Sequence, residues 1–154
     1  MSEIEIRPMR YGSAVVQRLV EAIYADQTVR YGGPDQTRIE SFEFDPPDGG
    51  FLVAYLDGTP VGCVGWRSHG DDETTAEVKR LFAAPEARNT GVATTLMRAI
   101  EQNAKDHGRT RMILETGHAQ PEAMALYEKL GYVPIPHFGH YKDTEGVRSY
   151  GRPL

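Results

Sequence analysis

The sequence predicts a single α/β (α+β) domain over residues 1–154, with a mixed, mostly antiparallel central sheet and helices on both faces. Three observations lead to this expectation. The chain of 154 residues is long enough to bury one core without metals or disulfides. Its first half has long apolar segments joined by tight turns, and its second half alternates helical spacing with short apolar strands. The predicted order is β-α-(α)-β-β-β-α-β-α-β-β, a meander that continues into β-α-β units.

The N-terminal third has strand and helix patterns in turn. Apolar and polar side chains alternate over residues 4–9, which predicts an edge strand that stops near Pro8. From Ser13 the apolar residues recur at helical spacing, which predicts a helix. A polar, glycine-containing stretch follows, and a short second helix is expected at residues 37–42. Residues 46–50, Pro-Pro-Asp-Gly-Gly, are expected to form a loop.

A hairpin is the clearest local signal. Apolar runs at residues 51–56 and 60–66 are separated by Asp57-Gly58-Thr59, and Asp-Gly between two such runs favours a tight hairpin turn because both residues tolerate positive φ. A third strand is expected at residues 75–83, after a polar tip at 68–74. The three strands form the predicted antiparallel meander.

The third strand contains an irregularity. Val78 and Leu81 are both apolar but lie three residues apart, so strict alternation cannot place both on one face. A β-bulge near Lys79 or Arg80 would place them together. The alternative is that Leu81 packs on a helix that covers the other face.

The second half of the chain alternates between helices and strands. The strongest helical stripe begins at Val92, and Gly108 is well placed to end that helix. Pro121 suits the first turn of a second helix that Gly131 closes. The other expected elements are strands at residues 111–116, 132–135 and 147–150.

Composition excludes several classes of protein. The formal net charge of −5 argues against general nucleic-acid binding, and the apolar runs are too short for a membrane span. The first residues lack the pattern of a signal peptide. Cys63 is the single cysteine, lies in an apolar run and is expected to be a core residue, which suits a reducing cytoplasm.

The segment Arg88–Ala93 carries the main chemical signal. It follows a strand and opens the best helix, and a helix N-terminus attracts phosphate through unpaired N–H groups and a positive partial charge. Gly91 and Ala93 are small enough for a close backbone approach, Thr90 and Thr94 add hydroxyl donors, and the Arg88 guanidinium suits a phosphate. The alternative is a tight turn whose glycine serves geometry alone. Neither the Walker A pattern nor the dinucleotide glycine pattern occurs.

Two longer motifs point to a family. Residues 78–93 resemble the central motif of the GNAT superfamily of N-acetyltransferases, with its [RQ]-x-x-G-x-[GA] signature. Residues 120–132 resemble the second hallmark helix of that family, with its Leu-Tyr-x-x-x-Gly-aromatic ending. Both occur in the family's order and spacing. The chain departs from the usual pattern at Gln120, where the family has Asn, and at Asn89, where glycine or arginine is frequent.

The resemblance implies acetyl-CoA as co-substrate, no metal, and direct transfer in a ternary complex to the amine of a small molecule, such as an amino acid or another metabolite. It also implies that the bulge separates two strands and that pantetheine binds backbone groups between them. The implied coenzyme A contacts are Leu81, Phe82, Ala83, Arg88, Asn89, Thr90, Gly91, Val92, Ala93, Thr94, Gln120 and Tyr127.

The resemblance also implies catalytic roles. Tyr127 matches the position whose hydroxyl lies near the thioester sulfur and is the expected general acid; the alternative is a core tyrosine on the helix face. Glu77 matches a position that often carries the base; the alternative is a surface glutamate that pairs with Lys79. Glu115, at the end of the next strand, is the second candidate base or a ligand of the acceptor's ammonium group.

The acceptor is expected to contact residues 24–44 and residues 138–141, and His118 either contacts substrate or caps a turn. Of the chain's arginines, four (Arg30, Arg38, Arg67 and Arg80) would suit an acceptor with a carboxylate. His137 and His140 have a spacing that can hold metal, but without convergent ligands the segment is expected to be a loop. A non-catalytic acyl-CoA-binding or sensor module is the competing hypothesis. A protein acetyltransferase is less favoured, and a homodimer is compatible with the sequence.

Overall fold

The computed structural model describes residues 3–35 and 39–154. The elements of the first half are β1 (Ile4–Pro8), α1 (Ala14–Tyr31), the 3₁₀ helix η1 (Ser41–Phe44), β2 (Gly49–Leu56), β3 (Thr59–His69) and β4 (Asp72–Ala83). Those of the second half are η2 (Pro85–Ala87), α2 (Val92–Asp106), β5 (Arg111–Gly117), α3 (Pro121–Lys129), β6 (Val133–Pro134) and β7 (Val147–Pro153). This order confirms the predicted succession of strands and helices.

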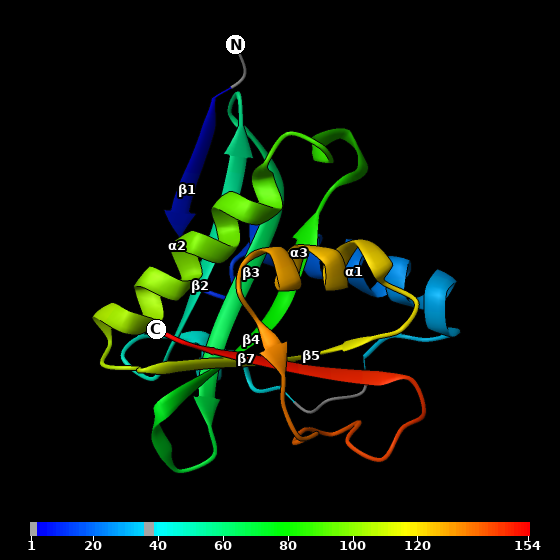
Figure 1. Cartoon of the computed structure of the whole chain (residues 1–154). Helices are drawn as coiled ribbons and strands as arrows, with labels where there is room; N and C mark the ends of the chain where they lie inside the picture. Colours follow the sequence, from blue (N-terminus) through cyan, green and yellow to red (C-terminus); the bar gives the residue numbers. More distant parts are fainter. Residues whose placement is uncertain (1–2, 36–38) are drawn as a thin grey trace.

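The described strands form one sheet in the order β1-β2-β3-β4-β5-β7-β6. Only β4 and β5 run parallel among these neighbours, and every other pair is antiparallel. Helices α2 and α3 lie in front of the sheet in Figure 1, and α1 lies behind it. The mixed, mostly antiparallel sheet with helices on both faces is therefore confirmed.

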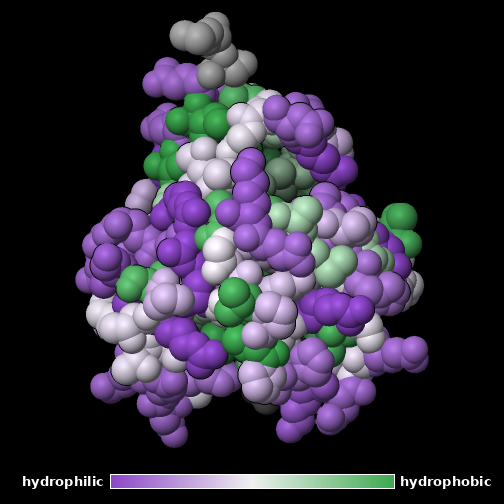
Figure 2. Space-filling model, viewed as in Figure 1, coloured by the Kyte–Doolittle hydropathy of each residue, from purple (hydrophilic) through white to green (hydrophobic). Residues whose placement is uncertain are grey.

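Each face of the sheet has its own hydrophobic core. Trp66, Leu96 and Met112 are fully buried in the cluster beneath α2 and α3. Val16 and Phe44 are buried in the cluster beneath α1 and η1. The outer surface over α2 and α3 is mainly hydrophilic (Figure 2), as expected for helices that bury one stripe of side chains. Among the described residues, no helix has the length and hydrophobicity needed to cross a membrane.

Turns and helix ends follow the local sequence closely. Asp57 and Gly58 both have positive φ, 51° and 86°, which confirms the tight β2–β3 hairpin. Ser13 caps α1 by accepting a hydrogen bond from the backbone N–H of Val16. Gly108 has φ 85° just beyond α2, as predicted for the residue that ends this helix.

The bulge in β4 is confirmed and lies at Arg80, which has φ 64° where the pairing with β3 shifts register. Val78 and Leu81 both pack in the cluster beneath α2 and α3. The extra residue leaves both Lys79 and Arg80 on the α1 face, where they bind the same carboxylate, that of Asp35. The bulge therefore places two cations side by side.

Strands β4 and β5 pair over a short stretch and then separate. The parallel pairing covers Thr75–Glu77 and Arg111–Ile113, whereas β5 continues beside β7 as far as Gly117. No β5 partner is recorded for the described residues of β4 after Glu77. The sheet thus opens beside the bulge, between the two strands that the sequence singled out.

Some predicted boundaries were wrong. The short helix is a 3₁₀ turn at Ser41–Phe44 and not at 37–42, of which residues 37 and 38 lie outside the described part. The third meander strand begins at Asp72 and not at 75, because β3 and β4 continue their pairing close to the turn. These shifts leave the topology unchanged.

Candidate active site

The N-terminus of α2 forms an open anion-binding turn. Gly91 precedes the helix with φ 87° and no side chain caps the first turn. Asn89 is also left-handed, with φ 64°, so the backbone turns twice within three residues. Residues 88–91 are exposed. The uncapped N–H groups of the first helical turn therefore face outward beside the positive end of the helix, as a phosphate site requires.

Side chains of this turn stabilise its shape. The Thr90 hydroxyl donates a hydrogen bond to the Ala87 carbonyl, and Arg88 Nε donates to the Ala83 carbonyl at 3.4 Å. A Cβ added to Gly91 would meet no atom within 4 Å, so the glycine is required for its positive φ and not for space. Thr90 was expected as a phosphate donor, but here its hydroxyl proton is used within the turn.

A cavity of about 490 Å³ lies beside the β4–β5 opening, because Lys79 of β4 and the end of β5 both line it. It is bordered by the C-terminal end of α1, the end of β5 and the start of α3. Its lining residues include Tyr31, Asp35, Lys79, Glu115, His118, Gln120 and Tyr141. Lys79 and Glu115, from different strands, thus meet at one cavity with the residue that begins α3.

Glu115 is held in a fixed orientation in this cavity. Its Oε2 accepts hydrogen bonds from the backbone N–H groups of Phe138 and Gly139, at 3.3 and 3.1 Å, and from the Ser149 hydroxyl at 3.2 Å. For Oε1, no hydrogen bond with a described residue is recorded. A Cβ on Gly139 would collide with Oε1, so glycine permits this close approach. One carboxylate oxygen is anchored, and the other is available to a ligand.

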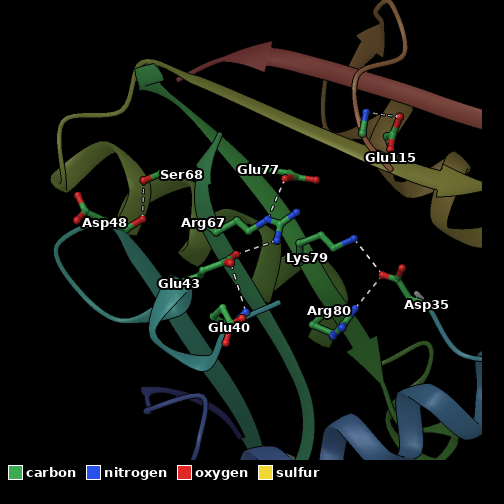
Figure 3. A network of polar contacts seen from close by, with 11 residues as sticks. Asp35, Glu40, Glu43, Asp48, Arg67, Ser68, Glu77, Lys79, Arg80 and Glu115 are labelled. Atoms are coloured by element: carbon green, nitrogen blue, oxygen red, sulfur yellow. Dashed lines mark hydrogen bonds and ion pairs between the residues drawn. The ribbon is translucent and has the colours of Figure 1, made fainter. Parts of the chain in front are cut away.

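Asp35 connects the segment after α1 to β4 (Figure 3). Its Oδ2 lies 3.0 Å from both Lys79 Nζ and Arg80 Nη1. The Tyr141 hydroxyl donates to Oδ1 at 2.8 Å. The Arg80 side chain is 2% exposed, and its Nη2 donates to the Tyr24 hydroxyl at 3.3 Å. This carboxylate therefore compensates a buried guanidinium and closes one wall of the cavity.

Glu77 is engaged in a different network. Its Oε1 lies 3.0 Å from Arg67 Nε, and Arg67 Nη1 lies 2.8 Å from Glu43 Oε2 (Figure 3). The proposed pairing of Glu77 with Lys79 was wrong, because Lys79 pairs with Asp35. Glu77 lines a second cavity of about 930 Å³, which also includes Phe138 to His140. The two candidate bases thus face separate cavities.

Tyr127 belongs to α3, and its side chain points into the core cluster that α2 and α3 cover. Its ring is 6% exposed and contacts the rings of Tyr132 and Tyr150, with centroids 5.9 and 6.1 Å away. No hydrogen bond between its hydroxyl and a described residue is recorded. Burial raises the pKa of Tyr127 well above its ordinary value, because the charged phenolate is less well solvated inside the protein.

The start of α3 lies against the end of α1. Gln120 occupies the N-cap position without capping the helix, and its Nε2 donates to the Tyr31 hydroxyl at 3.3 Å. The His118 ring meets the Tyr31 ring edge-on, with centroids 6.4 Å apart. Both Gln120 and His118 line the smaller cavity.

The arginines considered for an acceptor carboxylate are paired within the chain. Arg30 bonds Asp26 and Glu122, Arg67 bonds Glu43 and Glu77, and Arg80 bonds Asp35. Arg38 lies outside the described residues. Tyr141 lines the smaller cavity, whereas Phe138, Gly139 and His140 line the larger one. Among the described residues, no group of three or more His, Cys, Asp or Glu could hold a metal ion.

Sequence reasoning missed three residues of the site. Asp35 follows a Gly-Gly-Pro stretch that was interpreted only as a loop. Ser149 faces Glu115 across the β5–β7 pair, a register that no local pattern reveals. His137 was considered only as a metal ligand, but its ring nitrogen Nδ1 lies 2.7 Å from the Ser149 hydroxyl oxygen.

An uncapped helix N-terminus, an opening between parallel strands and a cavity beside it are the features expected of the acyl-CoA-dependent transferases that the sequence motifs resemble. The comparisons agree: the acetyltransferase (GNAT) family model matches residues 16–132, and the chain belongs to this family. The predicted family membership is confirmed.

Individual relatives are similar over part of their length. An IAA acetyltransferase of Azospirillum brasilense is 40% identical over 95 residues, which cover 62% of this chain and 61% of the relative. N-acetylaspartate synthetase of Rattus norvegicus is 35% identical over 107 residues, 70% of this chain and 36% of the relative. The chain therefore spans less than two thirds of these relatives.

Solved structures match over nearly the whole chain. A Klebsiella pneumoniae protein has a TM-score of 0.81 and 25% identity, with 98% of this chain and 97% of that chain covered. The PaiA N-acetyltransferase of Thermoplasma acidophilum, solved with coenzyme A, has a TM-score of 0.74 and 20% identity, with 99% of each chain covered. The latter likeness concerns the fold.

Proposed function

We propose that this chain transfers the acetyl group of acetyl-CoA directly to the amine of a small molecule. The observation that carries the proposal is the opening between β4 and β5 beyond Glu77, with the turn at Gly91 on one side and the cavity of Glu115 on the other. Coenzyme A was present in the solved PaiA relative, and the names of two curated relatives refer to acetylation of small molecules. These findings support acetyl-CoA as the donor and a small molecule as the acceptor.

The residues near the opening suit the proposed donor. The backbone N–H groups of Val92, Ala93 and Thr94 belong to the uncapped first turn of α2 and would bind the pyrophosphate, beside the Arg88 guanidinium. Phe82 and Ala83 lie on the separated part of β4, where backbone groups would bind the pantetheine amides. Leu81 is half-buried at the bulge and would limit the width of the opening.

Glu115 is the better candidate for the base. Glu115 lines the smaller cavity and its Oε1 has no hydrogen bond with a described residue, whereas Glu77 is bound by the Arg67 guanidinium. An ammonium group that enters the cavity would donate to Glu115 Oε1 and lose one proton there, and the neutral amine would then attack the thioester carbonyl. Glu77 would serve mainly to position Arg67 and Glu43.

Tyr127 is the proposed general acid. Its hydroxyl is protonated at neutral pH, as that of any tyrosine with an ordinary or raised pKa is, and would donate its proton to the thiolate that leaves as the thioester bond breaks. The position of Tyr127 on the face opposite Glu115 suits a base and an acid that act on the two sides of one thioester. Gln120 would bind near the same opening. A cytoplasmic location and a homodimer remain predictions.

The proposal is tested by an amine panel with acetyl-CoA and detection of the released thiol. Cys63 is 0% exposed, so the protein's own thiol should not react with the detection reagent. We expect turnover with at least one small amine, a loss of about 100-fold or more in kcat for Glu115→Gln, and little change for Glu21→Gln, an exposed glutamate on α1. Coenzyme A binding without turnover of any amine would instead support a non-catalytic acyl-CoA-binding module.

A further inference from the structure

A chain of hydrogen bonds leads from the cavity to the surface. Glu115 Oε2 accepts from the Ser149 hydroxyl at 3.2 Å, and Ser149 Oγ lies 2.7 Å from Nδ1 of His137. Glu115 and Ser149 face each other in the β5–β7 register, and His137 lies in the segment after β6. Ser149 is 4% exposed, whereas His137 is exposed. This series of hydrogen bonds therefore starts at a carboxylate in the cavity and ends at an imidazole in contact with solvent.

The hydroxyl of Ser149 is not needed to orient Glu115. Two backbone N–H groups, those of Phe138 and Gly139, already hold Oε2. The hydroxyl of Ser149 has one proton, which it can donate either to the Glu115 carboxylate or to a His137 Nδ1 that carries no proton. Imidazole is also the side chain whose protonation changes near neutral pH. This arrangement is that of a relay between a buried base and water.

We propose that Ser149 and His137 carry to solvent the proton that Glu115 takes from the acceptor's ammonium group. This inference rests on the proposed function for the source of the proton. Glu115 is the group that contacts the acceptor, and Ser149 and His137 act through it. The relay returns Glu115 to its ionised form after each transfer, so that the next acceptor meets a base.

The steps balance in protons. The N–H bond of the ammonium group breaks, its electron pair stays on nitrogen, and an O–H bond forms at Glu115 Oε1. Rotation of the carboxyl group about the Cγ–Cδ bond exchanges its two oxygens, so that Oε1 takes the place of Oε2 beside Phe138 and Gly139 and its O–H reaches Ser149. Ser149 turns its hydroxyl from Glu115 to Nδ1 of the Nε2–H tautomer of His137 and takes the proton of Glu115 as it passes its own to Nδ1. The exposed ring releases one proton from Nε2 to water, and exchange of ring protons with water restores the Nε2–H tautomer. Glu115 ends as a carboxylate, Ser149 as a hydroxyl and His137 as a neutral ring.

Few titratable groups contact the described residues of the relay. Among the described residues, Ser149 of β7 is the side chain that hydrogen-bonds the His137 ring. The titratable group at the other end of the chain is Glu115 of β5. The backbone N–H groups of Phe138 and Gly139 contact Glu115 without titrating.

The experiment combines chemical rescue with solvent isotope effects. We expect His137→Ala to lower kcat about tenfold, to increase the solvent isotope effect, and to regain at least half of its activity in added imidazole. Ser149→Ala should lose activity to a similar extent but should not respond to imidazole, because the connection to Glu115 is broken. His107→Gln, which removes a histidine at the end of α2, is the matched control and should behave as wild type. Unchanged turnover in His137→Ala, or a loss that imidazole does not restore, would overturn the relay.

A second measurement separates this inference from the proposed function. The His137 ring can be titrated by NMR in wild type, Glu115→Gln and Ser149→Ala without any substrate. We expect Glu115→Gln to change the titration of His137 and expect that change to disappear in the Ser149→Ala background. If the wild type acetylates no amine, the proposed function fails, and the relay is then judged only by the coupling between Glu115 and His137. Absence of this coupling would overturn the relay. If the wild type turns over and His137→Ala matches it, only the relay fails.

Discussion

Gly91→Ala tests whether the turn before α2 is a coenzyme A site. Gly91 has φ 87°, and a left-handed conformation costs an L-residue such as alanine about 1–2 kcal/mol. A Cβ there would meet no atom within 4 Å, so backbone strain is the whole perturbation. The turn is exposed, and we expect it to relax out of the left-handed conformation. Coenzyme A must then restore that conformation, and its dissociation constant should rise about 5- to 30-fold.

Gly58→Ala is the matched control. Gly58 has φ 86°, a Cβ there would also meet no atom within 4 Å, and the residue lies in the β2–β3 hairpin. It should lower the free energy of unfolding by about 1–2 kcal/mol without changing coenzyme A affinity. Calorimetric titration with coenzyme A and urea unfolding measure the two quantities. Equal coenzyme A affinities in Gly91→Ala and Gly58→Ala would refute the assignment of the turn.

Three further substitutions test the acid, the carboxylate at the cavity wall and the buried thiol. Tyr127→Phe should lower kcat about 100-fold while the dissociation constant of coenzyme A changes less than twofold; unchanged turnover would show a core tyrosine only. Asp35→Ala leaves the Arg80 guanidinium buried without its carboxylate and should lower the free energy of unfolding by about 3–5 kcal/mol in urea; a loss under about 1 kcal/mol would contradict the contact. Burial raises the pKa of the Cys63 thiol from 9.0 to about 12, so the native state favours the neutral thiol. The contribution of this thiol to the free energy of unfolding is fully present below pH 9. It is lost as the pH rises from 9 towards 12, by about 1.4 kcal/mol per pH unit. The free energy of unfolding measured in urea should therefore fall less steeply at alkaline pH in Cys63→Ala than in wild type. Parallel pH profiles of wild type and Cys63→Ala would rule this out.

Much of the fold could be predicted because its determinants are local. The Asp57-Gly58 turn, the glycine after α2 and the apolar stripe from Val92 each fix an element by neighbouring residues. The bulge was also predictable, because Val78 and Leu81 cannot share a face of a regular strand. The short helix near Ser41 was misplaced because a 3₁₀ turn of four residues has no periodic signal.

The candidate site was only partly predictable because its contacts join distant parts of the chain. Glu115 was identified from the end of a strand, but its partners Gly139 and Ser149 depend on strand register and loop path. The alternative partner considered for Glu77, Lys79, was wrong for the same reason. Arg67 reaches Glu77 from the neighbouring strand β3, and sequence spacing does not specify the register of the β3–β4 pair. Asp35 had no signal beyond its loop, although it binds both cations that the bulge places side by side.

The most direct test of the account is a single-turnover measurement of acetyl transfer from acetyl-CoA to the best amine of the panel, with wild type and Glu115→Gln compared at equal coenzyme A occupancy. The account predicts stoichiometric formation of the N-acetyl product with release of one thiol in wild type. It predicts a rate about 100-fold lower in Glu115→Gln, with the same affinity for coenzyme A. Equal rates in the two proteins would contradict Glu115 as the base, and absence of product from wild type, despite bound acetyl-CoA, would contradict the proposed function.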